Sequence, residues 1–143
     1  MATHRPPEWI DVETETEVFR FVKEPTREAS AVPKNFRSDK ARGKKNPTDR
    51  ELEYPALLCG MSAFISDEGA RDQWEEIELL HNPPGKPRKP LGFGDYIARL
   101  VLQPERGISY CLDGDGDHII LRGDETALAE CVEEVYLAAR NAD

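Results

Sequence analysis

The strongest constraint on the fold is a hairpin pattern late in the chain. Two β-rich runs, GISYCL at 107–112 and HIILRG at 118–123, flank the segment DGDGD at 113–117. Asp-Gly and Gly-Asp pairs tolerate the positive φ angles that tight hairpin turns require. The pattern therefore predicts two antiparallel strands joined by an acidic turn.

The same segment has an alternative interpretation as a calcium loop, because Asp113, Asp115, Asp117 and Asp124 have the spacing of oxygen ligands. A calcium loop of the EF-hand type also needs glycine at its sixth position, a bidentate glutamate at its twelfth, and flanking helices. Here the sixth position is His118, the twelfth is aspartate, and both flanks have a strand pattern. We interpret the segment as a solvated turn without a metal, and calcium binding stays the less favoured alternative.

The other apolar patterns predict three strands and two helices. The strands are expected at 17–23, at 55–66, where the apolar run should be buried, and at 95–103. A first helix is expected from about 67 to 80 with Ser66 and Asp67 at its cap, and a second from about Asp124 to Arg140. The apolar stripes are Ala70, Trp74, Ile77 and Leu80 on the first helix, and Leu128, Cys131, Val132, Val135 and Ala139 on the second.

This succession of elements predicts the fold class. The order is β–loop–β–α–β–β–β–α, which indicates an α+β domain with a mostly antiparallel sheet and two main helices. Residues 1–16 are polar and predict a loose tail, so that 17–143 form the single domain. Residues 24–53 form a long connection rich in proline and charge, and a connection of this length is usually functional or disordered.

Charge is distributed unevenly along the chain. The 143 residues carry a net charge of −9, which argues against general nucleic-acid binding and against an anionic-membrane partner. Loop 34–50, however, has seven basic and two acidic residues, a local charge of +5, and 85–90 add +3, leaving −17 for the rest. Loop 34–50 has the composition of a contact for phosphate or for an acidic partner, and the alternative is a solvated loop.

Cysteine usage and hydropathy predict the compartment. Cys59, Cys111 and Cys131 are odd in number and form no C-x-x-C pair, which argues against a disulfide scaffold or zinc site. No apolar run approaches membrane length, so we expect a soluble, cytoplasmic protein. Cys59 and Cys111 lie in apolar runs and are expected to be buried and unreactive.

Local motifs do not predict a reaction. The chain has no G-x-S-x-G, H-E-x-x-H or phosphate-binding glycine loop. His118 follows the hairpin turn, and either a structural hydrogen bond or a functional role fits a histidine at such a position.

Several segments together resemble a known superfamily. They are VFRFV at 18–22, LLCGMSAFISDEGAR at 57–71, GFGDYIARLVL at 92–102, ISYCL at 108–112 and GDHIILRGDETAL at 116–128. In the second segment a Gly-x-Ser strand leads directly into a helix. Over about residues 17–135 the chain resembles the ADP-ribosyltransferase-like superfamily and is similar to small bacterial proteins that share its architecture.

The resemblance implies a binding site for NAD. Active members carry an arginine on the first strand, a serine on the second and a late glutamate, and they break the bond between nicotinamide and ribose. Arg20 and Ser62 match the first two catalytic positions, and Glu125 is the carboxylate nearest to the third. Arg20 also has a structural interpretation, as a partly buried residue whose stem packs between Val18 and Val22. The cofactor-binding residues implied are Arg20, Gly60, Ser62, Lys34, Arg37 and Tyr54.

Two departures from the family pattern leave two functional hypotheses. Cys59 replaces the arginine or histidine usual before Gly60, and Glu125 is expected to open a helix instead of preceding a strand. We therefore expect a degenerate site in a non-catalytic binding or regulatory module, contacting a protein partner through acidic helix faces or loop 34–50. The alternative is an NAD-dependent ADP-ribosyltransferase or NAD glycohydrolase that uses Arg20 and Ser62.

Overall fold

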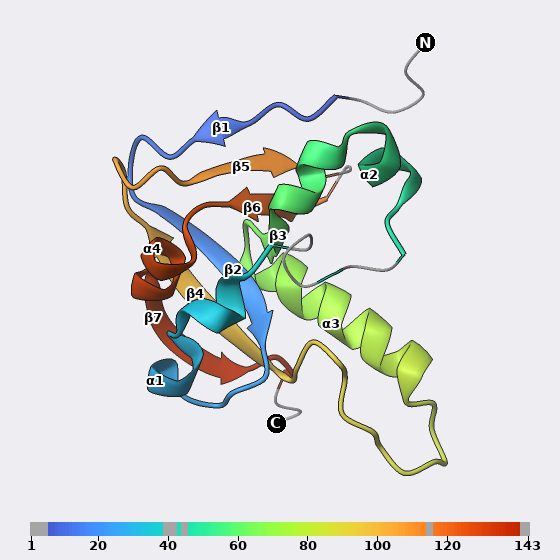
Figure 1. The fold of residues 1–143 in the computed structure, drawn as a ribbon. Coiled ribbons are helices and arrows are strands. Elements are labelled where there is room, and N and C mark those ends of the chain that lie inside the picture. Colours follow the sequence, from blue (N-terminus) through green and yellow to red (C-terminus); the bar gives the residue numbers. More distant parts are fainter. Residues whose placement is uncertain (1–5, 39–42, 44–45, 114–115, 141–143) are drawn as a thin grey trace.

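The chain folds around one antiparallel sheet, shown in Figure 1. The computed structural model describes residues 6–38, 43, 46–113 and 116–140. Over these residues the sheet has seven strands in the order β1-β5-β6-β3-β2-β4-β7, and every neighbouring pair is antiparallel. The strands are β1 (Ile10–Asp11), β2 (Thr16–Val22), β3 (Met61–Phe64), β4 (Tyr96–Leu102), β5 (Ser109–Leu112), β6 (His118–Arg122) and β7 (Val132–Leu137).

One long helix and several short helices pack on this sheet. They are α1 (Arg27–Ser30), α2 (Asp49–Glu53), α3 (Asp67–His81), α4 (Glu125–Glu130) and the 3₁₀ helices η1 (Pro33–Phe36) and η2 (Pro55–Cys59). The predicted α+β class with an antiparallel sheet is confirmed. No helix within the described residues is long and apolar enough to cross a membrane.

The predicted hairpin is confirmed. Strands β5 and β6 pair from Ser109↔Arg122 to Leu112↔Ile119, and the Asp113 N–H donates to the His118 carbonyl at 3.0 Å. Asp113 and His118 therefore face each other at the base of the turn.

Helix α3 begins where the sequence predicts. The Ser66 hydroxyl accepts from the Gly69 N–H at 3.0 Å, which satisfies one of the free donors of the first turn. Ala70 and Trp74 are buried against the sheet, and the Trp74 indole donates to the Gly94 carbonyl at 3.2 Å. Leu80, expected on the buried stripe, is 79% exposed, so the buried face ends before the last turn.

The predicted C-terminal helix from Asp124 to Arg140 is wrong beyond its first turns. Helix α4 stops at Glu130, and β7 follows from Val132. In the ladder between β4 and β7, Leu100 pairs with Val132 and Arg99 pairs with Glu134. Glu133 is therefore an extra residue on β7. This bulge turns both Val132 and Val135 toward one face, so a strand acquires the i, i+3 spacing that suggests a helix.

The apolar run at 55–66 is also divided differently from the prediction. Pro55 starts the 3₁₀ helix η2, consistent with its fixed φ and missing N–H, and only Met61–Phe64 form a strand. Gly60 joins the two elements, and a Cβ at this position would lie 2.8 Å from the Leu121 carbonyl oxygen of β6. Cys59, expected to be buried in a strand, is exposed at the end of η2.

Part of the expected N-terminal tail belongs to the sheet. Ile10 and Asp11 pair with Tyr110 and Ser109 of β5, and the Val12 N–H donates to the Ile108 carbonyl at 3.0 Å. Val12 is buried in the core. Residues 1–5 lie outside the described residues.

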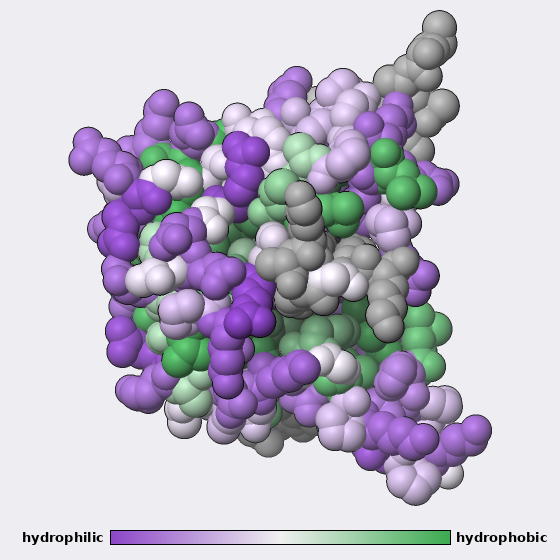
Figure 2. Space-filling model, in the orientation of Figure 1, coloured by the Kyte–Doolittle hydropathy of each residue, from purple (hydrophilic) through white to green (hydrophobic). Residues whose placement is uncertain are grey.

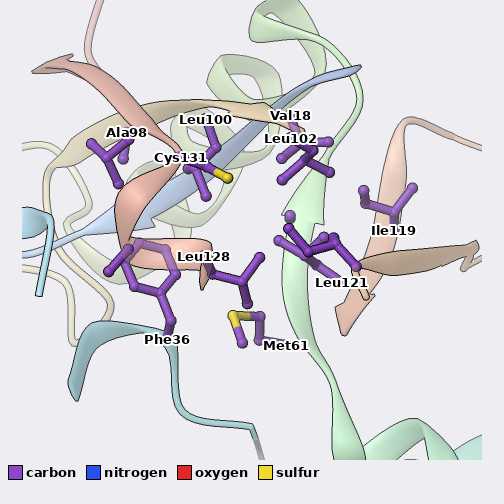
Figure 3. Close-up of a cluster of buried hydrophobic side chains, with 14 of the residues drawn as sticks. Val18, Phe36, Met61, Ala98, Leu100, Leu102, Ile119, Leu121, Leu128 and Cys131 are labelled. Carbon is purple, nitrogen blue, oxygen red and sulfur yellow. The ribbon is translucent and has the colours of Figure 1, made fainter. Parts of the chain in front are cut away.

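The two faces of the sheet are covered by different elements. On one face the main core includes Val18, Met61, Leu100 and Leu128 and is closed by α1, α4 and η1 with Phe36 (Figure 3). On the other face Trp74 of α3 packs in a cluster with Phe19, Phe64 and Ile97 of the sheet. Farther along this face, η2 covers Cys111 and Ile120. Ser62 and His118 lie on this second face, between the part under α3 and the part under η2.

Candidate functional site

The sheet is open along one seam, between β2 and β3. Strand β2 pairs with β4 at every residue from Thr16 to Val22. On its other edge it pairs with β3 at a single position, Phe19↔Phe64. Beyond that pair, the second half of β2 and the first half of β3 diverge.

Arg20 spans this open seam. Its side chain is buried, and one guanidinium nitrogen donates to the Ser62 carbonyl at 2.7 Å, while another is 3.4 Å from the Asn35 carbonyl of η1. An arginine thus bonds to a β3 carbonyl where β2 and β3 no longer pair directly. Its stem lies between Val18 and Val22, as the structural interpretation expected, and its head donates to these two carbonyl groups.

A cleft of about 790 Å³ occupies the seam. Three of the described residues that line it are cationic, Arg20, Lys23 and Lys34, and none is acidic. This is notable in a chain of net charge −9. In the space-filling view, apolar surface lies in a hollow near the centre of the molecule, with hydrophilic residues around it (Figure 2). The cleft therefore offers positive charge and apolar surface together, which suits an anionic organic ligand.

One wall of the cleft is an aromatic row formed by Phe93, Phe21, Phe64 and His118. The ring centroids of Phe93 and Phe21 are 4.8 Å apart, and those of Phe21 and Phe64 are 5.3 Å apart. The His118 ring meets Phe64 edge-on at 5.3 Å. The row provides flat apolar surface beside the three cations.

At the end of this row, Ser62, His118 and Asp113 form a hydrogen-bonded triad. Ser62 lies opposite Ile120 and His118 opposite Phe64, which makes Ser62 and His118 diagonal neighbours on one face of the sheet. The Ser62 Oγ is 3.0 Å from His118 Nε2, and His118 Nδ1 is 2.9 Å from Asp113 Oδ2. The triad thus links a β3 hydroxyl to a carboxylate at the hairpin turn.

The electrostatics of the triad fix its hydrogen-bond directions. The hydrogen bond from His118 lowers the pKa of Asp113, and the charge of Arg50 acts in the same direction, against the partial burial of the carboxyl. Arg50 of α2 lies 2.5 Å from the other Asp113 oxygen. An ionised carboxylate can only accept, so Nδ1 of His118 donates to it, and Nε2 of a neutral imidazole then accepts from Ser62.

The residues predicted from the resemblance divide into two groups. Arg20, Ser62 and Lys34 line the cleft. Gly60, Arg37, Tyr54 and Glu125 are not among its lining residues. Gly60 is buried against β6, Tyr54 packs beside the η2 cluster, Arg37 is exposed after η1, and Glu125 begins α4.

Sequence reasoning did not assign His118 to the site, and it missed Asp113, Lys23 and Phe93. In the sequence His118 stands alone, and Asp113 belongs to the predicted turn. Their partnership with Ser62 depends on the register between β3 and β6, which no local pattern contains. The confirmed hairpin was the available signal, because it sets Asp113 against His118.

The carboxylates of the alternative calcium loop are engaged elsewhere. Asp113 binds Arg50 and His118, Asp117 accepts from the Ser66 hydroxyl, and Asp124 caps α4. Asp115 lies outside the described residues, and within those residues no group of three or more potential ligands could hold a metal ion. Lys40, Arg42, Lys44 and Lys45 of the basic loop also lie outside the described residues.

The acidic helix faces expected to contact a partner carry internal ion pairs. Arg140 lies within 3.0 Å of carboxylate oxygens of Glu68, Asp72 and Glu75 on α3. Arg106 pairs with Glu130 on α4, and Arg99 pairs with Glu134, now on β7. Much of this acidic surface is therefore neutralised within the chain itself.

No family model, curated protein or solved structure matches this chain. The ADP-ribosyltransferase-like resemblance thus remains a prediction that rests on the residues quoted above.

Proposed function

We propose that this protein is a nucleotide-binding module whose cleft takes an anionic dinucleotide, with NAD as the first candidate. The observation that carries the proposal is the cleft of about 790 Å³ lined by Arg20, Lys23 and Lys34 without a carboxylate among the described lining residues. Cationic side chains favour a diphosphate, and the aromatic row beside them offers a surface for a nicotinamide or adenine ring. The volume lies within the range usual for cofactor pockets.

The resemblance adds a second line of support. It predicted that Arg20 and Ser62 act together, and they come from β2 and β3 and meet at the open seam, where Arg20 donates to the Ser62 carbonyl at 2.7 Å. Because that guanidinium also bonds the backbone, we assign it to shaping the cleft, and the more exposed Lys23 and Lys34 to binding phosphate.

The proposal is for binding without cleavage of the cofactor. Cleavage of the nicotinamide–ribose bond develops positive charge on the ribose, which a nearby carboxylate stabilises. No carboxylate is among the described residues that line the cleft. His118 lines the cleft, and Asp113 behind it is already bound by Arg50 and His118. We therefore expect NAD to bind and nicotinamide to stay attached, as in the degenerate site inferred from the sequence.

The test is the melting temperature with and without millimolar NAD, paired with a titration of NAD followed by calorimetry. A ligand at a hundred times its Kd stabilises by about 2.7 kcal/mol, which raises Tm by several degrees in a domain of this size. The Lys34→Ala variant should weaken binding several-fold, whereas Lys86→Ala, in the loop after α3, should not. Affinity should fall as salt rises.

Two results would overturn the proposal. Unchanged Tm and absent heat with both NAD and ADP would mean that the cleft is not a nucleotide site. Equal weakening by Lys34→Ala and Lys86→Ala would mean that binding is general attraction to positive charge. Chromatography of the NAD after incubation separates binding from cleavage, and free nicotinamide would restore the transferase or glycohydrolase alternative.

A further inference from the structure

We propose that Ser62 is a catalytic nucleophile that takes the acyl group of an anionic ester, with His118 as its general base and Asp113 positioning the imidazole. This inference does not rest on NAD binding, although both concern the same cleft. It follows from the order and the atoms of the hydrogen-bonded triad, Ser62 Oγ to His118 Nε2 at 3.0 Å and His118 Nδ1 to Asp113 Oδ2 at 2.9 Å. The same constellation activates serine on unrelated folds and is recognised by geometry, not by sequence order.

The sheet holds the nucleophile and base rigidly. Ser62 is in the middle of β3, and its neighbours Met61 and Ala63 are buried and paired with Leu121 and Ile119 of β6. His118 is the first residue of β6, and its ring rests edge-on against Phe64. Both side chains therefore project from regular strands whose register is fixed by the core beneath, as pre-organisation requires.

Asp113, the third member of the triad, is also held in place by a contact on its other side. Arg50 on α2 binds the Asp113 oxygen that does not face His118. The α2 helix that carries Arg50 has a capping box, with the Glu51 N–H donating to Thr48 Oγ1 at 3.2 Å and the Thr48 N–H donating to the Glu51 carboxylate at 2.8 Å. Asp113 thus keeps the imidazole in the tautomer whose Nε2 can accept the serine proton.

The nucleophile is accessible from the cleft. Ser62 is exposed, and the side chains of His118 and Asp113 are 30% and 31% exposed. The cations that line the cleft favour an ester that carries a negative charge, and the aromatic row favours a flat or apolar group next to it. Lys23 and Lys34 line the same cleft, and their charge is available to stabilise the oxyanion.

The reaction balances without a cofactor. Ser62 Oγ attacks the ester carbonyl as its proton moves to His118 Nε2, and the carbonyl electron pair moves onto oxygen. Collapse of this intermediate breaks the bond to the alkoxide, which takes the proton from His118 and leaves as the alcohol. Water then attacks the acyl-serine with His118 as base, releasing the carboxylic acid and restoring Ser62.

The test is covalent labelling with an alkyl fluorophosphonate, in which Ser62 Oγ would displace fluoride from phosphorus. Intact-mass spectrometry of the full chain should show one adduct, and peptide mapping should place it on Ser62. Ser62→Ala should abolish labelling. His118→Gln should slow it at least about 100-fold, the lower range for loss of a general base, whereas His81→Gln, which changes an exposed histidine at the end of α3, should not.

Two readouts separate catalysis from a structural hydrogen bond. The labelling rate of the wild type should fall on acidification, because a protonated imidazole cannot accept the serine proton, and Ser62→Ala should keep the wild-type Tm. The protein should hydrolyse a 4-nitrophenyl ester whose acyl group carries a second, free carboxylate faster than it hydrolyses 4-nitrophenyl acetate. Absence of a Ser62 adduct on folded wild-type protein, or equal labelling of wild type and His118→Gln, would overturn the proposal.

Discussion

Strand β2 (Thr16–Val22) has two neighbours in the sheet, and it pairs with them to very different extents. With β4 it forms a continuous ladder of seven residue pairs, and with β3 it shares one. The closed edge belongs to a part of the sheet buried on both faces, around Ala98, Leu100 and Ile97. At the open edge Arg20 bonds the Ser62 carbonyl, and the cleft lies there with its cations and with Ser62 and His118. The closed edge thus contributes buried core, and the open seam contributes the cleft of the candidate site.

The largest effect should come from the closed edge. Leu100 on β4 is fully buried, so Leu100→Ala should lower the free energy of unfolding by about 2–5 kcal/mol, measured in urea. Ser62→Ala, on the exposed face of the open seam, should stay within about 0.5 kcal/mol of the wild type. Similar losses from both variants would contradict the division between stability and function.

An intermediate effect is expected where the open seam is bridged. Arg20→Met should cost about 1–3 kcal/mol, because it leaves the Ser62 carbonyl without its charged donor. Arg27→Met is the matched control, since Arg27 donates to the Val132 carbonyl at 3.0 Å, away from the cleft. Both variants should lose stability in urea, but only Arg20→Met should weaken NAD binding and Ser62 labelling. Equal functional losses would remove Arg20 from the site.

The smallest effect concerns pH. The folded pKa of Asp113 lies below its ordinary value of about 3.9, so this group stabilises the fold above that pH, and the contribution is lost as pH falls through the lower folded pKa. The difference in unfolding free energy between wild type and Asp113→Asn should therefore shrink as pH falls below about 4. Urea unfolding at several pH values measures this difference. A difference that grows as pH falls below about 4 would mean that Asp113 is not stabilised by His118 and Arg50.

The sequence predicted those elements whose signals are local. Strand β2 alternates, the hairpin of β5 and β6 carries Asp-Gly signals, and α3 has a serine cap before its apolar stripe, so each pattern identifies its element without tertiary information. Strand β7 was missed because the bulge at Glu133 gives it a helical spacing of apolar residues. Here tertiary pairing overrides the local pattern.

The site was predictable only in part, for a similar reason. Arg20 and Ser62 were found through the resemblance, and Lys34 was among the residues it implied for the cofactor. The triad requires the register that sets Phe64 opposite His118, and the open seam requires knowing where pairing between β2 and β3 stops. Cys59 shows the same limitation, since an apolar run predicted burial and the 3₁₀ turn after Pro55 exposes it instead.

If ligands enter the open seam between β2 and β3, NAD should change amide exchange there. Amide hydrogen exchange, followed by mass spectrometry with and without saturating NAD, measures this. Bound NAD should slow exchange only in the segments that line the cleft, which are 20–23, 34–35, 62–64, 73–77, 92–93 and 118. The ladder between β4 and β7 should exchange at the same rate in both states. Protection confined to that ladder, or no change in any segment, would contradict ligand entry at the open seam.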